Sequence, residues 1–93
     1  MKITPAQRKE INSDLAAIRY SDTLLDKLNI VLQDSGLVLL DEEGQRFEGV
    51  FCGDDGKAVF DLELNGEYID NALLIFYWHK MESGRFEITA YIS

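Results

Sequence analysis

The sequence has little of several features that particular protein classes need. Its 93 residues include one cysteine, Cys52, so an intrachain disulfide framework is excluded and a reducing compartment is expected. No apolar run approaches the roughly 20 residues needed to span a bilayer. After Met1-Lys2-Ile3 the chain turns polar at once, so no signal peptide is expected. These absences predict a soluble, cytoplasmic protein without membrane contact.

Residues and motifs typical of catalysis are also scarce. His79 is the only histidine and lies in an apolar stretch, where a packing or surface role is expected. Asp54 and Asp55 lie close to Cys52 and disfavour the thiolate form that a nucleophile needs. No zinc spacing, calcium loop or glycine-rich phosphate loop is present. We therefore expect no enzyme activity, no cofactor and no bound metal.

Basic residues are few, and acidic residues are concentrated in the middle of the chain. The formal net charge is -8, from 17 acidic and 9 basic residues. The stretch Asp34–Asp70 alone carries -9, because its only bases are Arg46 and Lys57. This charge disfavours direct binding to nucleic-acid phosphates or to an anionic membrane, and it allows a basic partner. The alternative is that the charge serves solubility alone.

The N-terminal third predicts helix. Thr4, Pro5 and Gln7 match a capping box with proline at the first helical position. Gly36 suits the left-handed residue that ends a helix. Ser21-Asp22-Thr23 interrupts the apolar stripe between these ends, so we expect a break with one of its last two residues capping a second helix. One long helix is the alternative. The stripe consists of Ile11, Leu15, Ile18, Leu25, Leu28 and Leu32.

From Leu37 onward the apolar period changes to two, which is typical of strands. The expected strands are 37–40, 45–52, 57–64, one within 67–81 and one within 85–92. Asn65-Gly66 predicts a hairpin with a type I′ turn. We therefore expect a single α+β domain over residues 1-93. One or two N-terminal helices (about 4-35) pack on one face of a four- to five-stranded antiparallel meander sheet (about 37-92).

The last hairpin, around Ser83-Gly84, leaves open which side of the fourth strand faces the core. That strand is apolar on both sides. A two-residue turn puts Tyr77 inward and leaves Phe76 and Trp78 outside, whereas a three-residue loop reverses them. We favour the two-residue turn, because it pairs opposite charges across the strands and needs no bulge at Asp70-Asn71.

In either register, the side of the sheet away from the helices carries aromatic residues. This side must either be covered by another segment or serve as a binding surface. A loop or the N-terminal residues could cover it, or it could be a protein-protein contact, since aromatic residues often anchor interfaces. With the favoured turn, this side lies next to acidic residues of the neighbouring strands and turns. The predicted partner-binding residues are Asp54, Asp55, Asp61, Glu63, Glu67, Asp70, Phe76, Trp78 and Tyr91.

In size, charge and lack of catalytic motifs, the chain is similar in type to phage-encoded inhibitors of host defence, such as anti-CRISPR and anti-restriction proteins. No sequence motif carries this resemblance. It implies an inhibitor or DNA mimic that occupies a basic, nucleic-acid-binding surface of another protein or of a nucleoprotein complex. Two alternatives remain: an immunity protein against a basic toxin, and an interaction module that forms a homodimer through its aromatic side.

Overall fold

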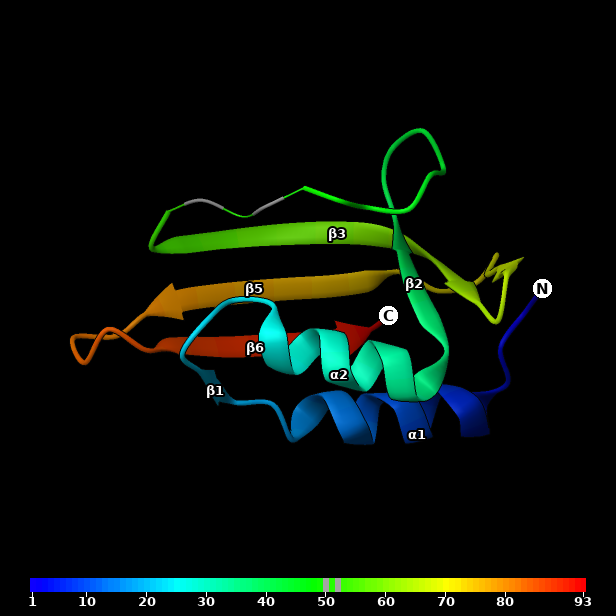
Figure 1. Ribbon diagram of the computed structural model, residues 1–93. Helices are drawn as coiled ribbons and strands as arrows, with labels where there is room; N and C mark the ends of the chain where they lie inside the picture. The colour runs from blue at the N-terminus through cyan, green and yellow to red at the C-terminus, as the bar shows by residue number, and fades with distance from the viewer. Residues whose placement is uncertain (50, 52) are drawn as a thin grey trace.

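The computed structural model describes residues 1–49, 51 and 53–93, and Figure 1 shows two helices across one face of an antiparallel sheet. The helices are α1 (Pro5–Ala16) and α2 (Asp26–Ser35). The strands are β1 (Tyr20–Ser21), β2 (Leu37–Leu40), β3 (Asp55–Leu64), β4 (Glu67–Tyr68), β5 (Leu74–Lys80) and β6 (Phe86–Ile92). Their order is β1-β6-β5-β3-β2, and β4 pairs with β3. The predicted α+β class is confirmed, with six strands instead of four or five.

Local capping signals set two of the helix ends. The Thr4 side chain accepts a hydrogen bond from the Gln7 backbone N–H (3.1 Å), and the Gln7 side chain accepts one from the Thr4 N–H (2.8 Å). This is the predicted capping box. At the end of α2, Gly36 has a φ of 72° and donates its N–H to the Gln33 carbonyl, as a left-handed glycine should.

A short strand, β1, separates the two helices, so the predicted break is confirmed. Neither Asp22 nor Thr23 caps α2, contrary to expectation: the N-cap is Leu25, and its side chain makes no capping hydrogen bond. The reason is that β1 first pairs with β6 at the edge of the sheet. Asp22 then accepts a hydrogen bond from Nε of Arg85 at 3.0 Å. Within the described residues, neither helix is long and apolar enough to cross a membrane.

An irregular segment between β4 and β5 decides which side of β5 is buried. Before it, the β3–β4 hairpin has the predicted two-residue turn, with positive φ at Asn65 (51°) and Gly66 (87°). If that register continued, Phe60 would lie opposite Asn71, but it lies opposite Leu74. A shift by an odd number of residues exchanges the two sides of a strand.

Contacts with the N-terminal segment hold these extra residues in place. The Asn71 side chain accepts a hydrogen bond from the Ile3 N–H and donates one to the Ile3 carbonyl, both at 3.0 Å. Arg8 also donates to the Asn71 carbonyl (2.9 Å). The expectation that no bulge is needed at Asp70-Asn71 is therefore wrong, because Ile3 and Arg8, 68 and 63 residues away in the chain from Asn71, stabilise these extra residues.

The β5–β6 hairpin has the three-residue loop, so the two-residue turn favoured from the sequence is wrong. Met81 donates its N–H to the Arg85 carbonyl (2.8 Å), and Gly84 within the loop has a φ of 88°. Ser83 keeps a negative φ, whereas a two-residue type I′ turn would force it positive. In the three-residue loop, the position with positive φ is thus occupied by Gly84 and not by Ser83.

Together, the two shifts reverse β5 alone, while β3 and β6 keep the inward sides expected from their alternation. Phe76 is fully buried and Trp78 is 8% exposed, whereas Tyr77 is 39% exposed. The predicted exposure of Phe76 and Trp78 and the predicted inward position of Tyr77 are therefore wrong. On β6, Ile88 is buried as expected and lies opposite Trp78.

The described residues between β2 and β3 (41–49, 51, 53 and 54) do not form the predicted strand. The described part of 45–52 is irregular apart from one isolated bridge between Leu40 and Arg46. Val50 and Cys52 lie outside the described residues.

Two phenylalanines of this segment help to cover the inner face of the sheet, where the segment runs along β3 (Figure 1). The ring centroids of Phe47 and Phe60 lie 4.7 Å apart, and those of Phe51 and Trp78 lie 4.9 Å apart. The Trp78 indole N–H donates to the Gly53 carbonyl (3.3 Å). Phe76 and Trp78 therefore lie on the core side of the sheet, and the side left over is the one with Tyr77.

Candidate functional site

No described element packs over the outer face of the sheet: both helices lie across its inner face (Figure 1), and Phe47 and Phe51 also pack against the core. The chain's four tyrosines lie on this outer face and are between 37% and 49% exposed: Tyr20, Tyr68, Tyr77 and Tyr91. The five phenylalanines and the tryptophan lie in or against the core: Phe47, Phe51, Phe60, Phe76, Phe86 and Trp78. The aromatic residues are therefore sorted by type between the two faces.

The centre of the outer face is apolar and aromatic. The strand registers place Val59, Ile75 and Tyr91 side by side on β3, β5 and β6. In the neighbouring row, Lys57 lies opposite Tyr77, with its Nζ 5.4 Å from the centre of the tyrosine ring. That distance is typical of a cation–π contact, so the face already holds one cation on a tyrosine ring.

Next to this centre, the β3–β4 hairpin adds a group that we call the hairpin corner: Asp61, Glu63, Glu67, Tyr68 and Asp70. The Tyr68 hydroxyl donates a hydrogen bond to Asp61 (3.2 Å), and Glu63 lies directly opposite Tyr68. The hydrogen bond to Asp61, followed by the charge of Asp61, raises the pKa of Tyr68 above its ordinary value of 10.0. Tyr68, Asp61 and Glu63 thus form one group on the outer face, whereas Glu67 is paired with Leu64 and lies on the other side of the hairpin.

Little of the negative charge at the hairpin corner is neutralised within the described chain. The amino group of Met1 lies 3.3 Å from Asp70. No lysine or arginine among the described residues forms an ion pair with the other three carboxylates, Asp61, Glu63 and Glu67. The corner therefore offers carboxylates that remain available to a cation from outside.

Two bases partly neutralise Asp54 and Asp55 at the opposite end of β3. The Lys80 Nζ lies 3.9 Å from Asp54, and His79 Nδ1 contacts the Asp55 carboxylate. The hydrogen bond to Asp55, followed by the charge of Asp55, raises the pKa of His79 above its ordinary value of 6.5. This end thus has less uncompensated negative charge than the hairpin corner.

The structure divides the predicted partner-binding residues into separate places. Phe76 and Trp78 belong to the core, so they are not available on the outer face. Tyr91 is exposed at its centre. The acidic residues form two groups about 20 Å apart, from a strand rise of about 3.3 Å per residue: Asp54 and Asp55 in one, and Asp61, Glu63, Glu67 and Asp70 in the other.

Sequence reasoning missed Tyr20, Tyr68 and Tyr77 as surface residues. One signal could have found Tyr77. A buried tyrosine needs a hydrogen-bond partner for its hydroxyl and a phenylalanine does not, so between two apolar sides of a strand the side with phenylalanine and tryptophan is the better candidate for the core.

The outer face offers ring faces, apolar area and carboxylates within one surface. It can therefore make stacking and apolar contacts in its centre and charge-assisted hydrogen bonds at the hairpin corner. Among the described residues, no group of three or more His, Cys, Asp or Glu side chains could hold a metal ion. Comparison of the chain with protein-family models, with curated proteins and with solved structures finds no match.

Proposed function

We propose that the chain is a small acidic binding protein that occupies a basic surface of another protein through the outer face of its sheet. The observation that carries the proposal is the continuity between the exposed tyrosines and the uncompensated carboxylates of the hairpin corner. Tyrosine is enriched at protein interfaces because it combines apolar area with a polar end. The occupant that fits such a surface is a basic protein or a nucleoprotein complex.

The charge distribution supports this choice of partner. The stretch 34–70 carries -9, and it supplies all the carboxylates of the hairpin corner. Asp61 and Glu63 lie on the same side of β3, where their like charges repel each other. A basic partner would relieve that repulsion, and the field of the corner would speed association at low salt.

The activity that fits this surface is inhibition: the chain would bind the basic surface of its partner and so block the ligand that normally binds there. Carboxylates presented on a rigid strand can take the place of phosphates on a surface that binds nucleic acid, as in the DNA mimics among phage-encoded anti-CRISPR and anti-restriction proteins. An immunity protein that blocks a basic toxin would use the same contacts. In both cases the chain acts without chemistry of its own, and its one cysteine fits a cytoplasmic site of action.

A second candidate function is self-association through the same face. It is favoured by the exposed apolar and aromatic centre, where Val59 is 48% exposed beside Ile75 and Tyr91. A homodimer formed there would bring the two acidic surfaces together, so raising salt should strengthen it. Binding to a basic partner should instead weaken with salt.

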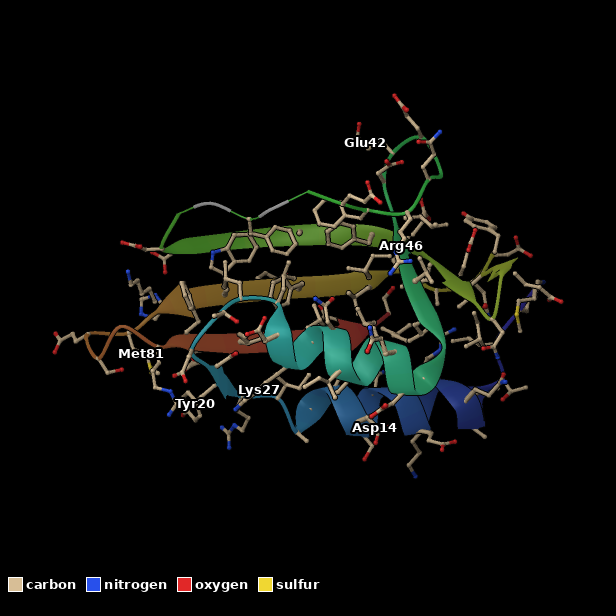
Figure 2. The ribbon with its side chains drawn as sticks, viewed as in Figure 1. Asp14, Tyr20, Lys27, Glu42, Arg46 and Met81 are labelled. Carbon is tan, nitrogen blue, oxygen red and sulfur yellow. The ribbon has the colours of Figure 1, made fainter. Side chains whose placement is uncertain are left out.

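A pair of charge-reversal variants tests the proposal. Asp61→Lys with Glu63→Lys changes the outer face, and Glu10→Lys with Asp14→Lys is the matched control, because both residues are exposed on α1 (Asp14 is labelled in Figure 2). Both double variants change the net charge equally. The wild type and both variants are immobilised and exposed to lysate of the native host, and bound proteins are identified at about 50 and 500 mM salt, over which the Debye length shrinks roughly threefold.

We expect a basic protein to bind the wild type and the α1 variant and to be lost from the outer-face variant and at high salt. Equal retention by all three proteins at both salt concentrations would reject the proposal. A wild type that captures no partner and dimerises more strongly at high salt would point to the second candidate function.

A further inference from the structure

Tyr68, Asp61 and Glu63 form the part of the outer face that is best suited to hold a single cationic side chain. We propose that these three residues form a site for an arginine of the partner. This inference rests on the proposed function and adds the identity of the cation: the site prefers a guanidinium group to a lysine ammonium.

The geometry supplies both components of a guanidinium site. Tyr68 is 49% exposed, so its ring has an open face. Its hydroxyl is fixed by the hydrogen bond to Asp61 (3.2 Å), which limits rotation of the side chain. Glu63, directly opposite on β3, places a second carboxylate beside the ring. Cβ atoms in such cross-strand pairs lie about 4.5–5.5 Å apart, within reach of one planar group that stacks on the ring.

The chemistry of the two cations separates them. A guanidinium is planar, stacks on an aromatic ring and can donate two parallel hydrogen bonds to a carboxylate at its edge. An ammonium is compact and strongly hydrated, so it gains charge attraction but little stacking. A guanidinium therefore gains both stacking on the ring and hydrogen bonds to the carboxylates of the hairpin corner. An ammonium gains mainly the charge attraction to the carboxylates.

The other tyrosines of the outer face lack one of these components. Lys57 already lies over the ring of Tyr77. Tyr91 has Ile75 opposite it and no carboxylate. Tyr20 has one carboxylate opposite it, Glu87, but among the described residues its hydroxyl makes no hydrogen bond to a carboxylate, unlike that of Tyr68. Tyr68 is thus the tyrosine with two carboxylates beside its side chain, Asp61 and Glu63. The Met1 amino group donates to its backbone carbonyl (2.6 Å), but no cation of the described residues lies over its ring.

The test compares two blocked nine-residue peptides that alternate glycine with arginine or with lysine and so have equal length and charge. Binding to the full chain is followed at about 50 mM salt by NMR of the tyrosine rings. The arginine peptide should bind about 2- to 5-fold more tightly, the factor that a cation–π contact gives at an exposed site. It should also shift the ring signals of Tyr68 more than those of Tyr91.

Three variants locate the site. Tyr68→Leu removes the ring and should bring the ratio of the two affinities close to one, whereas Tyr68→Phe keeps the ring and the preference. Tyr91→Leu, on the same face but away from carboxylates, is the matched control and should keep the wild-type ratio. Glu63→Gln should weaken both peptides. If Tyr68→Leu fails to fold, the ring shifts in the wild-type protein decide the question.

The outcomes separate this inference from the function on which it rests. Equal affinity for the two peptides, with salt-sensitive binding to the outer face, rejects the arginine site and leaves a general basic partner in place. An arginine preference that survives in Tyr68→Leu places the site elsewhere and also rejects it. Failure of both peptides to bind at low salt counts against the arginine site and the proposed function together.

Discussion

The inner and outer faces of the sheet both carry aromatic rings, but the rings differ by a hydroxyl group. The inner face has phenylalanines and Trp78, packed among aliphatic residues of the helices. The outer face has the tyrosines, each more than one third exposed. The single polar group among the inner rings, the Trp78 indole N–H, reaches the Gly53 carbonyl. A phenolic hydroxyl in the same core would need a similar hydrogen-bond partner. Phenylalanine and tryptophan therefore mark the face that packs in the core, and tyrosine marks the exposed face that is available for binding.

The largest expected effect comes from removing neighbouring rings on opposite sides of β5. Phe76→Ala should lower the free energy of unfolding by about 3–5 kcal/mol, because Phe76 is fully buried and its removal leaves a cavity. Tyr77→Ala should cost about 1 kcal/mol or less, since its side chain is partly in solvent. Urea unfolding of both variants measures the difference. Similar losses in the two variants would mean that β5 does not bury one side in preference to the other.

The loop that completes the inner face gives a smaller effect. Phe51 is half-buried and contacts the rings of Phe76 and Trp78. Phe51→Ala should cost about 1–3 kcal/mol, less than a fully buried ring, and should make the only tryptophan accessible to acrylamide. Fluorescence quenching checks this, with Glu48→Ala as a control in the same segment. A Trp78 signal that stays protected would show that the helices shield it without the loop.

The turn that fixes the register of β6 can be tested by two glycine exchanges. Gly84 has a φ of 88°, and a Cβ added there would meet no atom within 4 Å. Gly84→Ala should therefore cost about 1–2 kcal/mol from backbone strain alone. Ser83→Gly should also destabilise, by about 0.5–1 kcal/mol, because Ser83 has no positive φ to relieve. Stabilisation by Ser83→Gly in thermal unfolding would indicate the two-residue turn and the opposite face of β6.

Local signals predicted most elements of the fold. The Thr4 capping box, the glycine after α2 and the Asn65-Gly66 turn each act within a few residues, so their consequences can be read from the sequence. The orientation of β5 could not be read in this way. It depends on an irregular segment held by Asn71 and Ile3, which are 68 residues apart.

The candidate site was predictable in its charges and not in its rings. The carboxylates of the hairpin corner follow from the acidic composition around a recognisable turn, whichever side β5 buries. The rings depend on register, because a shift of one residue exchanges Phe76 and Trp78 with Tyr77. Because β5 is apolar on both sides, hydrophobic alternation does not indicate which side faces the core. The residues of the turns and the tyrosine hydroxyls are the signals that indicate it.

The smallest expected effect concerns the polar end of the outer face, where His79 lies among carboxylates. The hydrogen bond to Asp55 is the main cause of its raised pKa, and the charges of Asp55, Glu87 and Asp54 add to it. Because the pKa is higher in the folded state, the contact stabilises the protein fully below pH 6.5, the ordinary value, and the stabilisation is lost as pH rises through the folded pKa. Asp55→Asn should therefore lower the melting temperature at pH 5.5 more than at pH 8.

NMR gives a direct measurement, since His79 is the only histidine in the chain. Its ring signal should titrate with a midpoint above 6.5 in the wild type, lower in Glu87→Gln and lowest in Asp55→Asn, in the order of the contributions of the two carboxylates. An unchanged midpoint in Asp55→Asn would mean that the side chains do not meet in solution. The effect on stability should be small because both groups are mostly in solvent, where ion pairs contribute little. Contacts of this kind on the outer face therefore change the protonation of a side chain with little effect on stability, whereas removing a single ring from the inner face should lower the free energy of unfolding strongly.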